Sequence, residues 1–248
     1  MEISPRLEAL ARLVTPGGVV ADVGTDHALL PIYLIREGLA TRVIATDVER
    51  GPYSRALSRV EAEGLGDRIE VRKGDGLEPL APGEVQEVVI AGMGGQTIAA
   101  ILTRAHPSLL ATIDAFLLGP MTGAADLRYW LDRNLYAPVA ERLVEDSGRI
   151  YEIIKVSRDP NHLQGSYLGE IWDGSPPEDL RRVERAFLYE VGPCLWSQGD
   201  RLLRRYLEEK LRAVRAVQEE MASGGAAGGL KEEFVRRERL LRYLLERA

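Results

Sequence analysis

The sequence predicts an α/β protein with a doubly wound sheet of seven mainly parallel strands, followed by a C-terminal α-helical hairpin. Three observations support this fold. Short apolar runs alternate with helix-like patterns over the first 157 residues, as expected for strands buried between two layers of helices. A four-residue link then joins two further strand-like runs. From about Glu178 the pattern is helical to the end of the chain.

The first part of the chain supplies the parallel strands and the helices between them. MEISPRLEALARL predicts a charged amphipathic helix. Pro31 falls in the first turn of a second helix, and a third begins at Gly51-Pro52 and ends near Gly64. A further helical stripe consists of Leu127, Trp130, Leu131 and Leu135. The five predicted parallel strands are Val19–Val23, Arg42–Thr46, Arg68–Arg72, Glu87–Ala91 and Asp114–Leu118.

The sixth and seventh strands are expected to form a hairpin. Val139–Glu145 and Ile150–Val156 are separated only by the four residues 146–149, which include Gly148. A link this short can join only antiparallel strands, because a parallel pair needs a long crossover. The sheet is therefore expected to end in an antiparallel pair.

The C-terminal part predicts two helices joined by the glycine-rich stretch SGGAAGG at residues 223–229. Apolar residues recur there at three- and four-residue spacing, which indicates a coiled-coil hairpin. We expect a domain of residues 1–160 and a helical domain of residues 161–248. Residues 180–248 carry a net charge of +4 and the rest of the chain −10, so this part is either a scaffold or dimer element or a surface that contacts RNA. The apolar positions are Leu203, Leu207, Leu211, Val214, Val217, Met221, Phe234, Leu241 and Leu244.

Composition narrows the classes of protein to which the chain can belong. With 45% hydrophobic and 28% charged residues it is an ordinary globular protein, and no segment has the apolar length of a membrane span. No secretory signal begins the sequence, so a cytoplasmic location is the default expectation. The lone cysteine, Cys194, is expected in the core, and His106 and His162 lack partners at metal-ligand spacing, so we expect no metal. A monomer is compatible with the sequence, which does not determine the oligomeric state.

The candidate site lies where the parallel strands end, because ligands of open parallel sheets bind outside the carboxyl ends of the strands. Gly24, Asp26 and His27 follow the first strand, and Asp47 ends the second. Asp26 and His27 stand where a dinucleotide loop needs small residues to admit a pyrophosphate. Asp47 can accept hydrogen bonds from both hydroxyls of a ribose.

The turn after the third strand adds two residues to the candidate site. Asp75 can accept from an adenine amino group, and Gly76 leaves room for the ring. Together the three strand ends describe a ribosylated adenine whose third substituent is a cation. S-adenosyl-L-methionine, with its sulfonium and its amino-acid tail, has that chemistry.

The turn after the fourth strand allows a competing interpretation. Gly92, Gly94 and Gly95 open a helix and could form the dinucleotide loop of an NAD- or FAD-dependent oxidoreductase. However, three strand–helix units precede this loop, and the acidic residue about twenty positions on, Asp114, begins a strand instead of ending one. The glycines are also explained by the approach of a flat substrate, or by tight turning alone. A noncatalytic RNA-binding protein with this fold is the third alternative.

The motifs DVGTDHALLPIYL, GPYSRALSRVEAEGL, VRKGDGL, IAGMGGQTI, LRYWL and YEIIKV together resemble the bacterial tRNA (adenine-22 N1)-methyltransferase family, TrmK. The resemblance covers essentially the whole chain. It implies a Rossmann-like class I methyltransferase domain that uses S-adenosyl-L-methionine, with a coiled-coil extension that helps to hold tRNA. The cofactor contacts that it implies are Asp22, Gly24, Asp26, His27, Asp47, Asp75, Gly76, Ala91 and Gly92.

The resemblance also frames two expectations about the substrate side of the site. Methylation at N1 makes adenine cationic. We therefore expect Asp26 to accept a hydrogen bond from N6, and His27 to orient Asp26 or to contact the substrate. Alternatively, Asp26 caps the following helix and His27 shields the cofactor. The chain departs from the family where an aromatic residue is replaced by Leu29 and a Gln-Pro-Asn stretch by residues 119–121, Gly-Pro-Met. These departures concern recognition of the base and leave the cofactor contacts unchanged.

Overall fold

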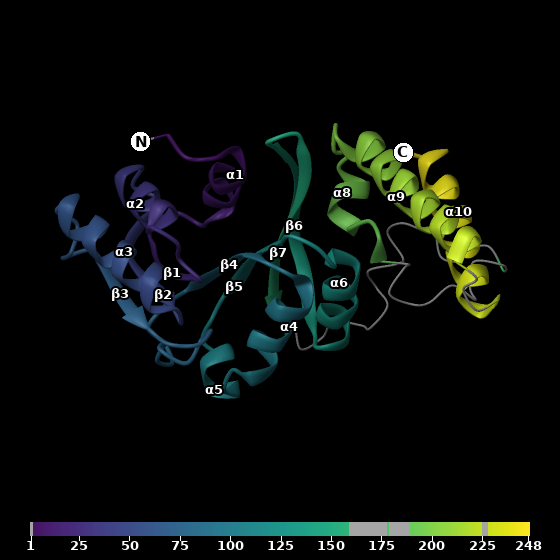
Figure 1. Ribbon diagram of the computed structural model, residues 1–248. Coiled ribbons are helices and arrows are strands. Elements are labelled where there is room, and N and C mark those ends of the chain that lie inside the picture. Colours follow the sequence, from purple (N-terminus) through teal and green to yellow (C-terminus); the bar gives the residue numbers. More distant parts are fainter. Residues whose placement is uncertain (1, 159–177, 179–188, 225–227) are drawn as a thin grey trace.

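The computed structural model describes residues 2–158, 178, 189–224 and 228–248. Its centre is a seven-stranded sheet with the strand order β3-β2-β1-β4-β5-β7-β6 (Figure 1). Strands β1 to β5 are parallel, and β7 is antiparallel to both β5 and β6. The strands are β1 (Gly18–Val23), β2 (Ala40–Asp47), β3 (Ile69–Lys73), β4 (Glu87–Met93), β5 (Ala115–Pro120), β6 (Tyr136–Asp146) and β7 (Arg149–Arg158). All seven strands confirm the prediction from the sequence.

Helices cover both faces of the sheet because neighbouring residues of the central strands point to opposite sides. On β1, Val20 packs with α1, α2 and α3, whereas Ala21 packs with α4, α5 and α6 (Figure 1). The same alternation is found at Val88 and Val89 of β4. These helices are α1 (Pro5–Leu13), α2 (Leu29–Arg36), α3 (Arg50–Ala62), α4 (Gly95–Arg104), α5 (Pro107–Leu110) and α6 (Ala124–Arg133).

Most of the predicted helix boundaries agree with the structure. Pro31 lies in the first turn of α2, and α3 ends before Gly64, which adopts a φ of +66°. Three expectations were wrong. No helix lies between β3 and β4, which are joined by the described residues 74–86, so two strand–helix units and not three precede the turn after β4. Leu135 lies beyond α6 in a left-handed conformation, φ +63°, because the helix ends at Arg133. Cys194 is half-buried instead of enclosed in the core.

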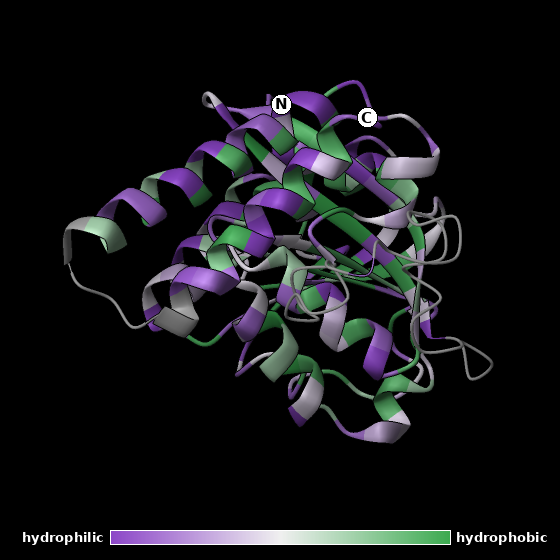
Figure 2. Cartoon of the chain, turned by 90° about the vertical axis from the view of Figure 1, so that its right-hand side faces the viewer, coloured by the Kyte–Doolittle hydropathy of each residue, from purple (hydrophilic) through white to green (hydrophobic). Residues whose placement is uncertain are grey.

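The C-terminal helices form the expected hairpin and pack against the sheet part of the chain. They are α8 (Pro193–Ser197), α9 (Leu203–Gly224) and α10 (Gly228–Leu245). Leu207 of α9 and Leu241 of α10 are fully buried in one cluster that also contains Ala125 of α6 and Leu143 of β6. Hydrophobic and hydrophilic residues alternate along the long helices in Figure 2. The predicted boundary at residues 160 and 161 lies outside the described residues, as does His162, which we expect to bind no metal.

A buried ion network joins the sheet to these helices. The Arg128 side chain of α6 is fully buried and pairs with Glu141 of β6 at 2.8 Å and Glu152 of β7 at 2.6 Å. The Tyr206 hydroxyl of α9 donates to Glu152. Arg128 also donates to the backbone oxygen of Tyr189 at 3.4 Å. Because buried charges are stable only when paired, this network fixes how α6, β6, β7 and α9 pack together.

No helix among the residues that the structure describes has the length and apolar character needed to cross a membrane.

Replacing Arg128 with Met is expected to lower the free energy of unfolding by about 3–5 kcal/mol, because two buried carboxylates lose their partner. Urea denaturation measures this loss. Arg12→Met is the control, because Arg12 forms only a surface pair with Glu8 and its loss costs about 0–1 kcal/mol. Equal destabilisation by the two variants would contradict a structural role for the network.

Candidate functional site

A cavity of about 590 Å³ opens at the carboxyl ends of β1, β2 and β4. It gathers residues from turns that are far apart in the sequence, because parallel strands end at one edge of the sheet. Eight of the nine predicted cofactor residues line it: Asp22, Gly24, Asp26, Asp47, Asp75, Gly76, Ala91 and Gly92. The ninth, His27, does not. It lines a shallow surface pocket with residues of α3.

The turn after β1 is held tightly against β2. The backbone amides of Gly24 and Thr25 both donate to the carbonyl oxygen of Thr46, at 2.8 and 2.9 Å. Gly24 has a φ of +79°, and a Cβ at this position would collide with the side chain of Met93. The end of the Met93 side chain could move aside, so the positive φ is the reason that this turn of the cavity wall favours glycine.

Two carboxylates of the cavity are held in surroundings that disfavour their charge. Asp22 is only 8% exposed, and burial raises its pKa to about 6. Asp47 ends β2, and burial raises its pKa as well. The Glu49 backbone amide donates to one oxygen of Asp47 at 2.8 Å, which fixes the orientation of that carboxylate. A cation or a hydroxyl donor bound here would stabilise both charged forms.

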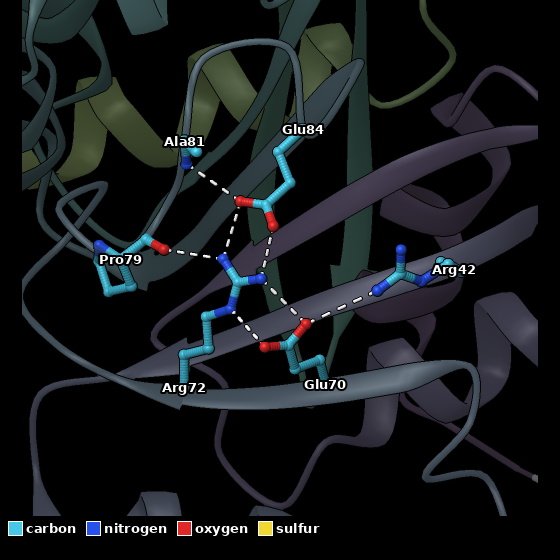
Figure 3. A network of polar contacts seen from close by, with 6 residues as sticks. All are labelled: Arg42, Glu70, Arg72, Pro79, Ala81 and Glu84. Atoms are coloured by element: carbon cyan, nitrogen blue, oxygen red, sulfur yellow. Dashed lines mark hydrogen bonds and ion pairs between the residues drawn. The ribbon is translucent and has the colours of Figure 1, made fainter.

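The loop after β3 is fixed by an arginine network (Figure 3). Arg72 of β3 donates to Glu70 from Nε at 2.8 Å and to Glu84 and the Pro79 carbonyl from Nη1, both at 2.8 Å. Hydrogen bonds from Arg72 lower the pKa of Glu84 to about 2. The Ala81 amide also donates to Glu84, at 3.0 Å. The network ties both sides of the loop to β3, so that the loop's first residues keep their place at the cavity.

Asp75 and Gly76 are those first residues. Arg104 of α4 pairs with Asp75 at 3.0 Å, with both side chains about half exposed. Gly76 has a φ of +56°, and a Cβ there would lie 2.9 Å from the Ile101 side chain. Beyond this ion pair lies a smaller cavity of about 300 Å³, which shares Asp75, Gly76, Ile101 and Arg104 with the first.

The loop between β1 and α2 carries the two predicted catalytic residues. Asp26 is 62% exposed and accepts a hydrogen bond from Arg55 of α3 at 2.9 Å. The His27 Nε2 lies 3.4 Å from the same Asp26 oxygen. His27 and Ala28 both have positive φ values, 61° and 50°, a conformation that non-glycine residues adopt at a cost. The alternative that Asp26 caps α2 is wrong, because Ala28 holds the cap position without a side-chain bond.

The turns after β4 and β5 are tied together on the other side of the cavity. The Met121 amide donates to the Met93 carbonyl, and the Gly95 amide to the Thr122 carbonyl, both at 2.8 Å. Met121 lies in the segment that departs from the family pattern. It lines a separate groove of about 250 Å³ between this turn and α9, whereas the second departure, Leu29, lines the main cavity.

Sequence reasoning missed several residues of the cavity wall. Val48 and Glu49 directly follow Asp47 and could have been found from that neighbourhood. Arg104 lies a full helix beyond β4, and Arg6 comes from α1, so no motif connects either of them with the other strand ends. Only the tertiary structure brings them to the cavity.

The cavity is suited to a polar ligand with cationic character. Five carboxylates and two guanidinium groups line it: Arg6, Asp22, Asp26, Asp47, Glu49, Asp75 and Arg104. The glycine turns leave space for a flat ring, and the excess of negative charge opposes a pyrophosphate. In the part of the chain that the structure describes, no group of three or more His, Cys, Asp or Glu side chains could hold a metal ion.

Comparisons with known proteins agree with this chemistry. Residues 3–154 match the family model described as a methyltransferase domain. The chain is 31% identical over 222 residues to the tRNA (adenine(22)-N(1))-methyltransferase of Bacillus subtilis, covering 90% of this chain and 87% of that protein.

Solved structures extend the similarity over nearly the full length. The crystal structure of the B. subtilis M1A22 tRNA methyltransferase TrmK matches with a TM-score of 0.82 at 29% identity, covering 98% of this chain and 99% of that one. A Streptococcus pneumoniae structure in complex with S-adenosyl-L-methionine matches with a TM-score of 0.80 at 30% identity, covering 98% and 100%. The chain belongs to the tRNA (adenine(22)-N(1))-methyltransferase family.

Proposed function

We propose that this protein transfers a methyl group from S-adenosyl-L-methionine to N1 of adenine 22 in tRNA. The observation that carries the proposal is the cavity in which the ends of β1, β2 and β4 and the loop after β3 present carboxylates around glycine turns. Family membership supports the reaction and its cofactor. It also favours a methyltransferase over the oxidoreductase that the glycines after β4 would allow.

The residues present fit this cofactor. Any side chain at Gly24 or Gly76 would meet a neighbouring residue and narrow the cavity. Asp47, oriented by the Glu49 amide, accepts from the ribose hydroxyls. Asp75 accepts from the adenine amino group, and Asp22 binds the cationic amino-acid end. S-adenosyl-L-methionine supplies a methyl group on a sulfonium, which is reactive without activation by the protein.

The protein's catalytic task is to position the base and to stabilise its developing charge. The N1 lone pair of adenine lies in the ring plane, so no general base is required. We assign Asp26 to accept a hydrogen bond from N6, because a carboxylate stabilises the ring as it becomes cationic. Arg55 fixes the Asp26 carboxylate at 2.9 Å. His27 lies outside the cavity wall, so we assign it a role in orienting Asp26.

We infer that the helical hairpin contacts tRNA, with residues 1–160 holding the cofactor and residues 161–248 contributing to RNA binding. Arg201, Arg204 and Arg212 are exposed on or beside α9. Phosphate contacts of this kind position an RNA without reading its sequence. A base within folded tRNA must then be unstacked to reach the cofactor.

Incubation with labelled S-adenosyl-L-methionine and total bacterial tRNA, followed by mapping of the modified nucleoside, tests the function. The proposal expects 1-methyladenosine at position 22. Label at another nucleoside would contradict the assigned base. Absence of label, together with a thermal shift by NAD, would favour an oxidoreductase, and absence of a shift by either cofactor would favour a noncatalytic RNA-binding protein.

The dissociation constant of S-adenosyl-L-methionine is expected to rise about tenfold between pH 7 and pH 5. The cause is Asp22, whose pKa of about 6 means that it is charged at the higher pH and protonated at the lower. Only the charged form attracts the cationic tail. Calorimetric titration of the wild type and Asp22→Asn measures this. Asp22→Asn should bind the cofactor weakly, with a dissociation constant that changes little with pH. If the variant kept the full pH dependence, Asp22 would be excluded as its cause.

Asp26→Asn is expected to lower kcat about 100-fold while changing cofactor affinity less than threefold. The amide accepts the N6 hydrogen bond without supplying negative charge. Single-turnover rates and equilibrium binding separate the two effects, with Asp67→Asn as an exposed control. Collapse of cofactor binding with normal turnover at saturating cofactor would show that Asp26 serves the cofactor alone.

Replacing Arg201, Arg204 and Arg212 together with Ala is expected to weaken tRNA binding about tenfold. The slope of the logarithm of the binding constant against the logarithm of the salt concentration should fall by about three, because three phosphate contacts are lost. Point variants are preferable to truncation, because α9 and α10 share a core with α6 and β6. Filter binding at several salt concentrations measures both effects. The matched control replaces three exposed arginines of the sheet part, Arg12, Arg36 and Arg42, and an equal loss there would contradict a specific role for the hairpin.

A further inference from the structure

We propose that Arg6 binds the carboxylate of the cofactor's amino-acid tail. The inference rests on the proposed function, because it concerns the same cavity and the same cofactor. It adds a binding residue that none of the sequence motifs contains.

The charge of the cavity wall requires such a residue. The amino-acid tail carries one carboxylate, and five carboxylates of the wall would repel it. Two arginines line the cavity. Arg104 is already paired with Asp75 at 3.0 Å, so it neutralises a residue of the wall. Among the wall residues that the structure describes, Arg6 is then the cation that remains for an anionic group of the ligand.

The surroundings of Arg6 hold its guanidinium without a close ion pair. Its Cζ lies 5.1 Å from the centre of the Tyr151 ring, and Nη1 contacts the Met121 sulfur. Nε is buried without a hydrogen-bond partner. Among the residues that the structure describes, no carboxylate forms an ion pair with Arg6 within 4.0 Å. The Asp146 carboxylate interacts with the charge of Arg6 and accepts hydrogen bonds from the side chains of Ser147 and Ser4 and from the backbone of Arg6.

The backbone beneath Arg6 is fixed before any ligand binds. Arg6 follows Pro5, the first residue of α1, and the Ser4 side chain accepts from the Leu7 amide at 3.4 Å. Leu10 and Ala11 of the same helix are fully buried. A guanidinium that is already positioned loses little entropy on binding, and its planar donors match both oxygens of a carboxylate.

The test compares two ligands that differ by one group, S-adenosyl-L-methionine and its decarboxylated analogue. Calorimetric titration of the wild type should show at least tenfold tighter binding of the carboxylated ligand. Arg6→Met should lose ten- to a hundredfold in affinity for that ligand and less than threefold for the analogue, which abolishes the discrimination. Arg6→Lys keeps the charge and should retain part of it. Arg12→Met, an exposed variant on the same helix, should bind as the wild type does.

Two results would overturn the inference. An equal loss of affinity for both ligands in Arg6→Met would indicate a structural role. Unchanged affinity for both, together with weaker tRNA binding, would assign Arg6 to an RNA phosphate instead. The proposed function fails independently: if the wild type discriminates between the two ligands, Arg6→Met does not, and the wild type methylates no tRNA, Arg6 keeps its role and the reaction is wrong.

Discussion

Buried charge at one edge of a parallel sheet is the constraint on which this molecule depends. Parallel strands bring their carboxyl ends to the same edge, where Asp22 is the last residue but one of β1 and Asp47 is the last residue of β2. Keeping Asp22 charged at neutral pH costs about 3 kcal/mol relative to water, given its pKa of about 6. A cation bound beside Asp22 would offset that cost, so the burial of this carboxylate favours a cationic ligand.

Arginine side chains form ion pairs or hydrogen bonds with acidic groups in several parts of the chain. Arg55 and Arg104, from the helices after β2 and β4, hold Asp26 and Asp75 at the cavity rim. Arg72 anchors the loop after β3, and Arg128 joins the sheet to the C-terminal helices through two buried carboxylates. Paired charges therefore stabilise both the cavity edge and, separately, the packing of the C-terminal helices on the sheet.

The sequence predicted the features that depend on local patterns of residues. It did not predict the positions that are determined by long-range packing. The seven strands follow from apolar runs, and six cavity residues follow from strand-end turns, whereas Asp22 and Ala91 were predicted only through the resemblance to the family. Arg6 was missed because its helix reaches the cavity only through its packing on the sheet. His27, whose backbone is left-handed at φ +61°, lies with residues of α3 outside the cavity, although Asp26 and Leu29 on either side of it line the cavity. The hydrophobic periodicity of the sequence predicts neither the packing of α1, which brings Arg6 to the cavity, nor the position of His27.

A crystal structure with S-adenosyl-L-homocysteine bound tests this account most directly. The account predicts adenine beside Asp75 and Gly76, ribose hydroxyls on Asp47 and the amino-acid end beside Asp22. Binding of the ligand in the neighbouring cavity lined by His106 and Leu109, or with its amino-acid end remote from Asp22, would contradict it.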